Sequence, residues 1–346
     1  MPARTCLTML LAAVYGVAGA QAMPRLEAPQ PVPRLHAEQL AIVINDAEPN
    51  SVAIGEYYRR VRNIPAANVV HVRIPGRPHR LDPPDFARLK ASIEGQLGPG
   101  IEAVLMLWTA PYAVGCNAIT SAFTLGYDAA QCANPCAPGR ASAYYNAASA
   151  RPYTDFKMRL SMLLPIESVA ESRALIDRGV ASGFRLSPAT AYYLQTSQTA
   201  RNARAPLFPR AGANAARKLR VASLHADALQ DVRDIIIYQT GMASVTGLDS
   251  LGFLPGALAD HLTSFGGDLL ASSQMSSLRW LEAGATASYG TVSEPCNYWQ
   301  KFPHPTVLLK HYSGGSSAIE AYWRSVAWPA QGLFLGEPLA APYGRN

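Results

Sequence analysis

Residues 40–62 read LAIVINDAEPNSVAIGEYYRRVR, and this stretch decides the fold. Residues 40–44 are a short continuous apolar run, which is typical of a buried parallel strand. The run ends at an Asn-Asp pair, and Ser51 then begins a helix in which apolar residues recur near helical spacing. A strand followed by a helix at this interval indicates a β-α-β unit.

The same alternation continues along most of the chain and predicts an α/β fold, with a mostly parallel sheet flanked by helices. Apolar residues make up 49% of the 346 residues, enough for a large core. Between about 109 and 151 the alternation stops, which indicates a cysteine-bearing loop insertion. We expect residues 39–342 to form one domain. The predicted strands are 40–44, 69–74, 103–108, 160–164, 191–194, 219–224, 234–240, 285–292 and 332–336, and the predicted helices are 51–62, 83–97, 167–181, 256–264, 275–283, 304–312 and 317–326.

Residues 1–22 have the pattern of a secretory signal peptide: a basic residue, an apolar stretch and an Ala-Gln-Ala cleavage site. Residues 23–38 are rich in proline and predict an extended linker. No later apolar run reaches the roughly 18 residues that a membrane span needs, so we expect a periplasmic or secreted protein with no span in the mature chain. The arginines are dispersed rather than set in a basic stripe with aromatic residues, which argues against a nucleic-acid partner.

Four cysteines remain after that cleavage: Cys116, Cys132, Cys136 and Cys296. An even number in an oxidising compartment favours two disulfides, with three possible pairings. The spacing of Cys132 and Cys136, with Cys116 upstream, would also suit a tetrahedral zinc site. Because the compartment is the stronger argument, we expect disulfides and neither a metal nor another cofactor.

Five phrases occur together along about residues 40–342. They are NDAEPNS at 45–51, YYRRVRNIPAAN at 57–68, PGALADHLTSFGG at 255–267, GATASYGTVSEP at 284–295 and GLFLGEP at 332–338. Together they resemble a family of secreted bacterial proteins with no assigned function. This resemblance implies no particular reaction.

The Gly-Ala start of the strand at 284–285 and the terminal Gly-Glu-Pro at 336–338 also resemble, more distantly, the gingipain-like cysteine peptidases of the caspase fold. The resemblance implies a caspase/gingipain-like sheet. In those enzymes a His-Gly follows one strand and an Ala-Cys follows the next. Here His225 and Thr240 stand in similar order, but His225 has no following glycine and Thr240 stands where the thiol is expected.

That substitution matters because a thiol is partly ionised near pH 7, whereas a hydroxyl needs an adjacent general base. A conventional cysteine-peptidase mechanism is therefore not expected. Cys296 follows a strand and could be a nucleophile, but disulfide pairing explains it more simply. The resemblance, with the missing cysteine, therefore leads us to expect a pseudo-peptidase.

The predicted helix 256–264 carries Asp260 and His261 close to hydroxyl residues, which are the residue types of a hydrolase triad. Adjacent residues on a helix point about 100° apart, so Asp260 could meet Ser264 while His261 points elsewhere. One interpretation is that these polar residues tie down the turn at 266–267. The other is that they face the carboxyl ends of the strands, where open α/β sheets bind ligands.

Asn45 and Asp46 directly follow the first strand and so belong to the same ligand-binding edge. The alternative is an Asx turn that leads into a capped helix. Glu294, together with His304 and Glu337, lies near strand ends in the final third of the chain, where the three could converge on a cation or act as an acid–base pair.

Three functional hypotheses follow. The first is an exported protein with a peptidase-like fold that lacks the catalytic cysteine and binds a peptide or cell-envelope ligand. The second is a hydrolase in which His261 or His225 acts as base with a hydroxyl or a metal-bound water. The third is a structural protein that packs against an envelope partner. In the first hypothesis the binding edge consists of Asn45, Asp46, Thr240, Asp260, His261 and Glu294.

Overall fold

The computed structural model describes residue 1 and the ranges 34–183 and 187–344. The predicted signal peptide beyond its first residue, and the predicted linker up to residue 33, lie outside the described residues. Within the described ranges, no helix combines the length and the apolar character of a membrane span.

The described residues form an 11-stranded sheet in the order β2-β1-β4-β7-β14-β13-β12-β11-β8-β10-β9. Neighbours run parallel through β2-β1-β4-β7 and through β13-β12-β11-β8-β10. In contrast, β14 runs antiparallel to β13 and shares one parallel pair, Leu335–Leu163, with β7, and β9 runs antiparallel to β10. The strands are β1 Leu40–Asn45, β2 Val69–Val72, β4 Ala103–Leu107, β7 Leu160–Leu163, β8 Ala189–Gln195, β9 Gly212–Asn214, β10 Leu219–His225, β11 Ile235–Thr240, β12 Phe253–His261, β13 Ala287–Thr291 and β14 Gly332–Gly336.

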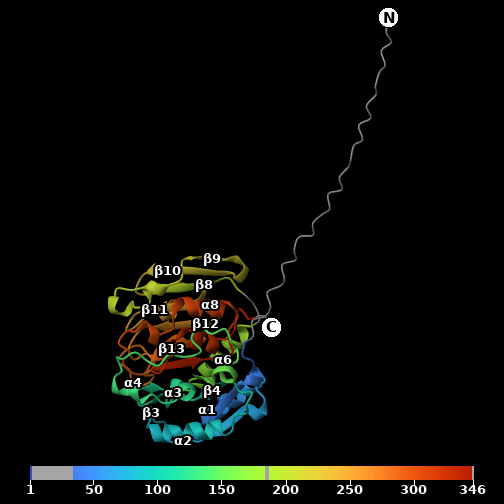
Figure 1. The fold of residues 1–346 in the computed structure, drawn as a ribbon, viewed down its shortest axis with the longest axis vertical. Coiled ribbons are helices and arrows are strands. Elements are labelled where there is room, and N and C mark those ends of the chain that lie inside the picture. The colour runs from blue at the N-terminus through green and yellow to red at the C-terminus, as the bar shows by residue number, and fades with distance from the viewer. Residues whose placement is uncertain (2–33, 184–186, 345–346) are drawn as a thin grey trace. The chain divides into compact units, whose positions relative to one another are not determined.

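Helices flank this sheet, and β9 and β10 lie at the end of the molecule opposite α2 (Figure 1). The predicted large, mostly parallel sheet flanked by helices is therefore confirmed at the level of the α/β class. The helices are α1 Pro49–Arg62, α2 Pro83–Glu94, α3 Ile119–Leu125, α4 Ala129–Ala133, α5 Pro152–Phe156, α6 Val169–Ala181, α7 Leu278–Glu282, α8 Pro305–Ser313 and α9 Ala318–Ser325. A second, three-stranded sheet consists of β3 Arg80–Leu81, β5 Ala113–Val114 and β6 Asn117–Ala118.

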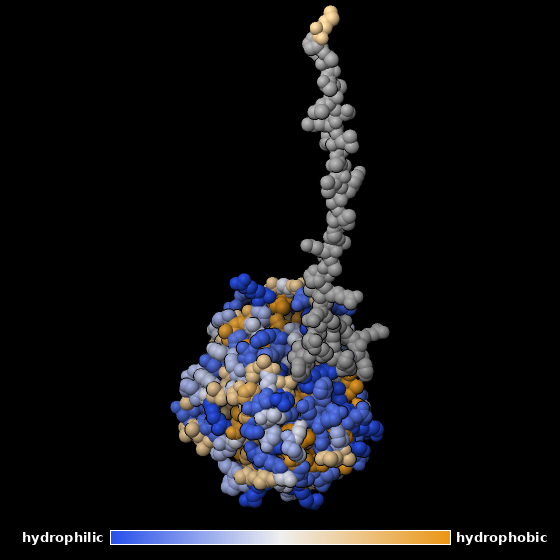
Figure 2. Space-filling model, turned by 45° about the vertical axis from the view of Figure 1, so that its right-hand side comes forward, coloured by the Kyte–Doolittle hydropathy of each residue, from blue (hydrophilic) through white to orange (hydrophobic). Residues whose placement is uncertain are grey.

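The core lies on both faces of the large sheet. Every residue of β1, β4, β7 and β11 is buried, which explains why these strands are rich in apolar residues on both faces and do not alternate apolar with polar residues. Trp323 of α9 stacks on Phe334 of β14 with the ring centres 4.1 Å apart, which ties a helix to the middle of the sheet. On the face seen in Figure 2, hydrophilic residues predominate and hydrophobic ones are scattered among them.

The predicted helix at 256–264 is wrong, because residues 256–261 belong to β12 and the strand ends at His261. Its Ala and Leu residues favour a helix by local propensity, but the segment lies between β11 and β13 and is buried from Gly256 onward. Burial in the centre of a sheet overrides a weak helical preference. Asp260 and His261 are consecutive strand residues and therefore point to opposite faces of the sheet.

Candidate ligand-binding site

Loops that follow the parallel strands gather at one edge of the large sheet. Tyr112, beyond β4, donates its hydroxyl hydrogen to Asp268, beyond β12, at 2.5 Å. Arg80, beyond β2, donates to the carbonyl of Val292, beyond β13, at 2.9 Å. The carboxyl ends of both parallel groups therefore lie at the edge where open α/β sheets bind ligands.

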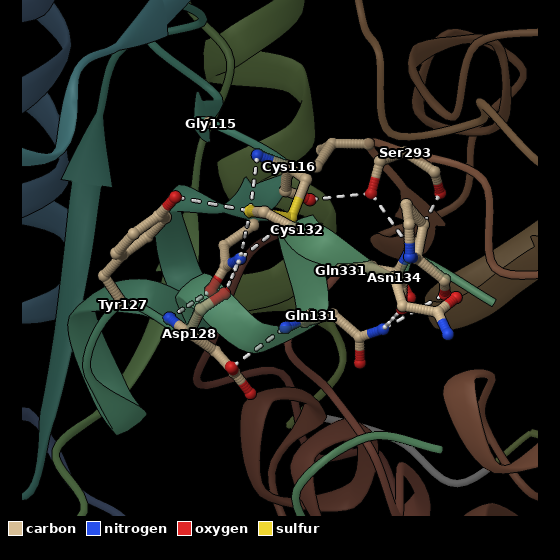
Figure 3. The surroundings of a disulfide bond; sticks show 12 residues. Gly115, Cys116, Tyr127, Asp128, Gln131, Cys132, Asn134, Ser293 and Gln331 are labelled. Carbon is tan, nitrogen blue, oxygen red and sulfur yellow. Dashed lines mark hydrogen bonds between the residues drawn. A yellow bond between two sulfur atoms is a disulfide. The ribbon is translucent and has the colours of Figure 1, made fainter. Parts of the chain in front are cut away.

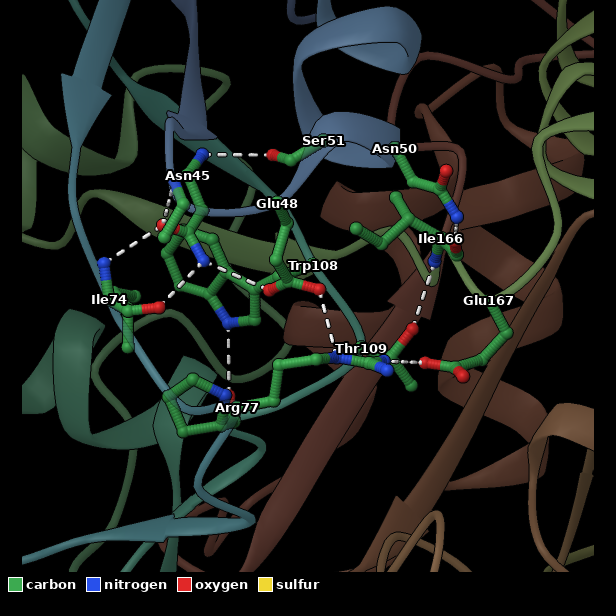
Figure 4. A network of polar contacts seen from close by, with 12 residues as sticks. Asn45, Glu48, Asn50, Ser51, Ile74, Arg77, Trp108, Thr109, Ile166 and Glu167 are labelled. Carbon is green, nitrogen blue, oxygen red and sulfur yellow. Dashed lines mark hydrogen bonds and ion pairs between the residues drawn. The ribbon is translucent and has the colours of Figure 1, made fainter.

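Asn45 is completely buried at this edge, and its side chain organises the turn after β1. Its Oδ1 accepts hydrogen bonds from the backbone N–H groups of Ala47 and Ile74, at 3.2 and 2.8 Å. Its Nδ2 donates to the Ile74 carbonyl and to Glu48 Oε1, at 3.1 and 2.9 Å. These are the contacts of an Asx turn, so the Asn45 side chain shapes the site without reaching a ligand (Figure 4).

Arg77 bridges two carboxylates in front of this turn. Its Nε lies 3.0 Å from Glu48 Oε2, and its Nη2 contacts Oε1 of Glu167, which follows β7. The Glu48 side chain is 9% exposed, whereas those of Arg77 and Glu167 are 47% and 41% exposed. Figure 4 shows Arg77 reaching both carboxylates. These two ion pairs connect the loops that follow β1, β2 and β7.

The backbone at Arg77 is strained. Its φ is 47°, in the left-handed region, directly after Gly76 at φ 75° and directly before Pro78. A non-glycine residue in this conformation costs about 1 kcal/mol or more. The two ion pairs of Arg77 therefore help to stabilise the turn in this conformation.

A cavity of about 270 Å³ opens beside this arginine. Its lining combines one guanidinium and two carboxylates with apolar residues. Such a set can bind a carboxylate through the arginine and an ammonium through the glutamates. The lining includes Glu48, Asn50, Ile74, Arg77, Ile166 and Glu167.

Asp46 lies outside the lining of this cavity. Its Oδ1 is 2.7 Å from Nδ1 of His71, and the two side chains are 45% and 53% exposed. A polar contact as exposed as this one contributes little to stability. Asp46 therefore lies at the surface near the cavity.

His261 and Thr240 are neighbours in the register of β11 and β12. The Trp280 indole N–H donates to His261 Nδ1 at 2.9 Å, and His261 Nε2 lies 3.1 Å from the carbonyl oxygen of Met275. This arrangement requires a neutral ring with its proton on Nε2. Burial lowers the pKa of His261 to about 3. The imidazole thus has no nitrogen left to accept a substrate proton, and it is not arranged as a general base.

Asp260 points to the opposite face and forms a buried ion pair with Arg204. Its Oδ2 also accepts from Gln239 Nε2 at 2.9 Å, and Arg204 donates to the carbonyls of Thr240 and Pro303 at 2.8 and 3.2 Å. Burial raises the pKa of Asp260, and Arg204 opposes that rise. These contacts connect the ends of neighbouring strands. The prediction that Asp260 meets the hydroxyl of Ser264 along a helix is therefore wrong.

His225 and Thr240 are not adjacent. His225 ends β10 and is exposed, while Thr240 ends β11, and β8 lies between these two strands. Strands are about 4.8 Å apart, so the two residues are separated by roughly 10 Å across the sheet. The Thr240 hydroxyl is buried and has no hydrogen-bond partner in the described part of the chain.

Glu294 and Glu337 lie at opposite ends of the antiparallel pair β13–β14, so they do not converge. Glu294, beyond β13, accepts from the Cys296 backbone N–H at 2.7 Å. Glu337, beyond β14, accepts from the Tyr58 hydroxyl at 2.7 Å and from Arg62 Nη2 at 2.6 Å. The predicted common cation or acid–base site in the final third is therefore wrong.

Two disulfides hold the cysteine-bearing segment at the carboxyl edge. Cys116 pairs with Cys132 and Cys136 with Cys296, with Cα–Cα distances of 5.3 and 5.2 Å. Ser293 adds a hydrogen bond of 2.7 Å to the Cys116 carbonyl (Figure 3). All four cysteines of the described ranges are thus in disulfides, which leaves none of them to ligate zinc or to act as a nucleophile.

The sequence analysis missed the charged residues of the cavity. Glu48 and Glu167 each follow a parallel strand by a few residues, so the rule that pointed to Asn45 also covers them. Arg77 carried only a weaker signal, its place in a Pro-Gly-Arg-Pro turn. Of the residues predicted for one binding edge, Asn45 and Asp46 lie at the turn after β1, whereas Thr240, Asp260 and His261 are buried in contacts within the protein.

No family model matches this chain, and no curated protein matches it. Among solved structures, a chain titled "Structure of Protease" is similar to it at 9% sequence identity. The similarity covers 89% of this chain and 79% of that chain, with a TM-score of 0.48.

Proposed function

We propose that this chain is an exported binding protein on a caspase/gingipain-like scaffold, and that the cavity beside Arg77 binds the charged end of a peptide. The observation that carries the proposal is the position of Arg77, held in a left-handed conformation between Glu48 and Glu167. Strain of this kind is concentrated at functional sites.

The three charged groups differ in how easily they can exchange partners. Glu48 is nearly buried and is also held by Asn45, so it fixes one side of the guanidinium. Glu167 is 41% exposed, and such a partner is bound weakly. A peptide carboxylate would replace Glu167 on the guanidinium fork, and the released Glu167 would accept an ammonium group.

A binding role fits the rest of the edge better than hydrolysis does. The cysteines that the structure describes are all in disulfides. The imidazole of His261 is engaged on both nitrogens. The remaining candidate base, His225, lies two strands from the candidate hydroxyl at Thr240.

Export is supported by the two disulfides, because such bonds persist in oxidising compartments. The signal-peptide pattern at residues 1–22 supports the same conclusion. The scaffold assignment is supported by the large, mostly parallel sheet and by the Gly-Glu-Pro that follows its antiparallel strand β14. We treat residues 39–342 as one domain with an insertion near 109–151.

Calorimetric titration of the purified protein with short peptides tests this function. Trialanine, its N-acetylated form and its C-amidated form reveal which charged end is bound. We expect Arg77→Gln to weaken binding of the preferred peptide at least tenfold. Arg73→Gln, an exposed arginine that precedes the same turn, is the matched control and should leave affinity unchanged.

Two results would overturn the proposal: equal affinity of Arg77→Gln and wild type, or no binding of any of the three peptides. Cell-envelope fragments form a second panel in the same assay. If those fragments bind equally well to wild type and to Arg77→Gln, the result would instead favour the envelope-partner hypothesis.

A further inference from the structure

A second cavity, of about 200 Å³, lies along α6 and reaches α7. It shares Glu167 with the first cavity, so the two meet at the loop between β7 and α6. Its leucine and glutamate lining residues are Leu175, Leu278, Leu281, Glu167, Glu171 and Glu282.

The walls of this second cavity are leucine side chains from two helices. Leu175 of α6 and Leu281 of α7 are 2% and 6% exposed, so the walls are fixed parts of the core. Leu278, on the first turn of α7, is half-buried. An aliphatic side chain would bind most favourably in a cavity of this kind, because burial of apolar area would supply most of the binding free energy.

The rim of this cavity is acidic in a chain whose formal net charge is +6. Arg178 also borders the cavity, but its Nη2 donates to the backbone carbonyls of Leu281 and Ala285, at 2.9 and 3.1 Å. Glu282 has an exposed ion pair with Arg279, which is worth little. Even with the positive charge of Arg178 counted, the three glutamates leave the lining with a formal charge of −2, which complements a ligand that carries positive charge beside its apolar group.

We propose that the α6–α7 cavity is a subsite for a leucine-sized side chain of a cationic peptide whose charged end lies beside Arg77. The inference rests on the proposed peptide-binding function. Because Glu167 borders both cavities, the two groups belong to residues close together in the ligand, where an extended chain advances about 3.3 Å per residue.

The subsite is tested directly with small amines that cannot fill both cavities. Leucine methyl resonances of the full chain are followed by NMR during titration with leucinamide, alaninamide and N-acetylleucinamide. We expect leucinamide to shift the methyls of Leu278 saturably. Alaninamide, which lacks the side chain, and N-acetylleucinamide, which lacks the charge, should each bind at least fivefold more weakly.

Leu278→Gln and Glu171→Gln should each lower leucinamide affinity at least fivefold. Their matched controls are Leu224→Gln, an exposed leucine on β10, and Glu56→Gln, an exposed glutamate on α1, and neither should change it. Glu171→Gln serves as the second variant because it removes no core atoms. Equal binding of leucinamide and alaninamide, or full affinity in both cavity variants, would overturn the subsite.

The two proposals fail separately in these experiments. Arg77→Gln should not weaken leucinamide binding, since that probe has no carboxylate and the variant releases Glu167 to accept its ammonium group. If leucinamide saturates the cavity and no tripeptide binds, the peptide-binding function fails. If the subsite exists, replacing one alanine of trialanine by leucine should raise the affinity, and Leu278→Gln should remove that increase. If trialanine binds through Arg77 but this increase is absent, the subsite proposal is wrong.

Discussion

Acidification from pH 7 to pH 5 should destabilise the folded protein through His261. Burial lowers the pKa of this imidazole to about 3 in the folded state, against about 6.5 in an unfolded chain. Between these values the unfolded chain binds a proton that the folded chain does not, so stability present above pH 6.5 is lost progressively as the pH falls toward 3. The two pKa values give a loss of about 2 kcal/mol between pH 7 and pH 5.

The physical origin of this loss is burial of the imidazole, and a further obstacle to its charged form is the indole of Trp280. It donates to His261 Nδ1 at 2.9 Å, and a proton on Nδ1 would place two N–H donors against one another. Urea unfolding at both pH values, for wild type and His261→Gln, measures the effect. We expect wild type to lose about 2 kcal/mol more than the variant on acidification.

Other histidines do not affect this comparison. Burial lowers the pKa of His304, and that of His311 to about 4, but both residues are present in each protein. His225→Gln is the control, because His225 is exposed, and it should keep the wild-type pH dependence. An equal loss in wild type and His261→Gln, or an NMR titration of His261 near pH 6.5, would refute the reasoning.

Three further predictions concern stability. Glu337→Gln should cost about 3 kcal/mol in urea unfolding, because Arg62, whose side chain is 15% exposed, loses its buried carboxylate partner; an unchanged midpoint would contradict this. Gly290→Ala should cost about 2 kcal/mol, since a Cβ there would lie 2.4 Å from Ser277 Oγ, whereas Gly98→Ala, whose Cβ meets nothing within 4 Å, should be neutral in the same assay. The unreduced protein should be four hydrogens lighter by mass spectrometry than the reduced protein, and a free thiol in the described ranges would contradict the two disulfides.

The order of strands and helices could be predicted because its signals are local. The apolar run at 40–44 and the helical spacing after it coincide with β1 and α1 almost residue for residue. The segment at 256–264 could not be assigned this way. Its residues become a strand only because β11 and β13 flank it, which is information about the whole sheet rather than about the segment.

The candidate site could be predicted only in part for a similar reason. The rule that ligands bind at the carboxyl ends of parallel strands led to Asn45, which follows this rule at the end of β1 and contacts Glu48 of the proposed cavity. The contact between Arg77 and Glu167 joins residues 90 positions apart, and no local pattern announces it. The same holds for Cys136 and Cys296, which are separated by 160 positions.

The residues that look most catalytic in the sequence are the least free to act. Releasing Asp260 from Arg204, or His261 from Trp280, would leave a buried polar group unpaired, and that costs several kcal/mol for a charged pair. Releasing Arg77 from the half-exposed Glu167 costs about 1 kcal/mol or less. A ligand can therefore compete for Arg77 with ordinary binding energy but cannot compete for the buried pairs. This difference in cost supports the proposal that the turn after β2 binds a ligand, while the end of β12 gives structural support.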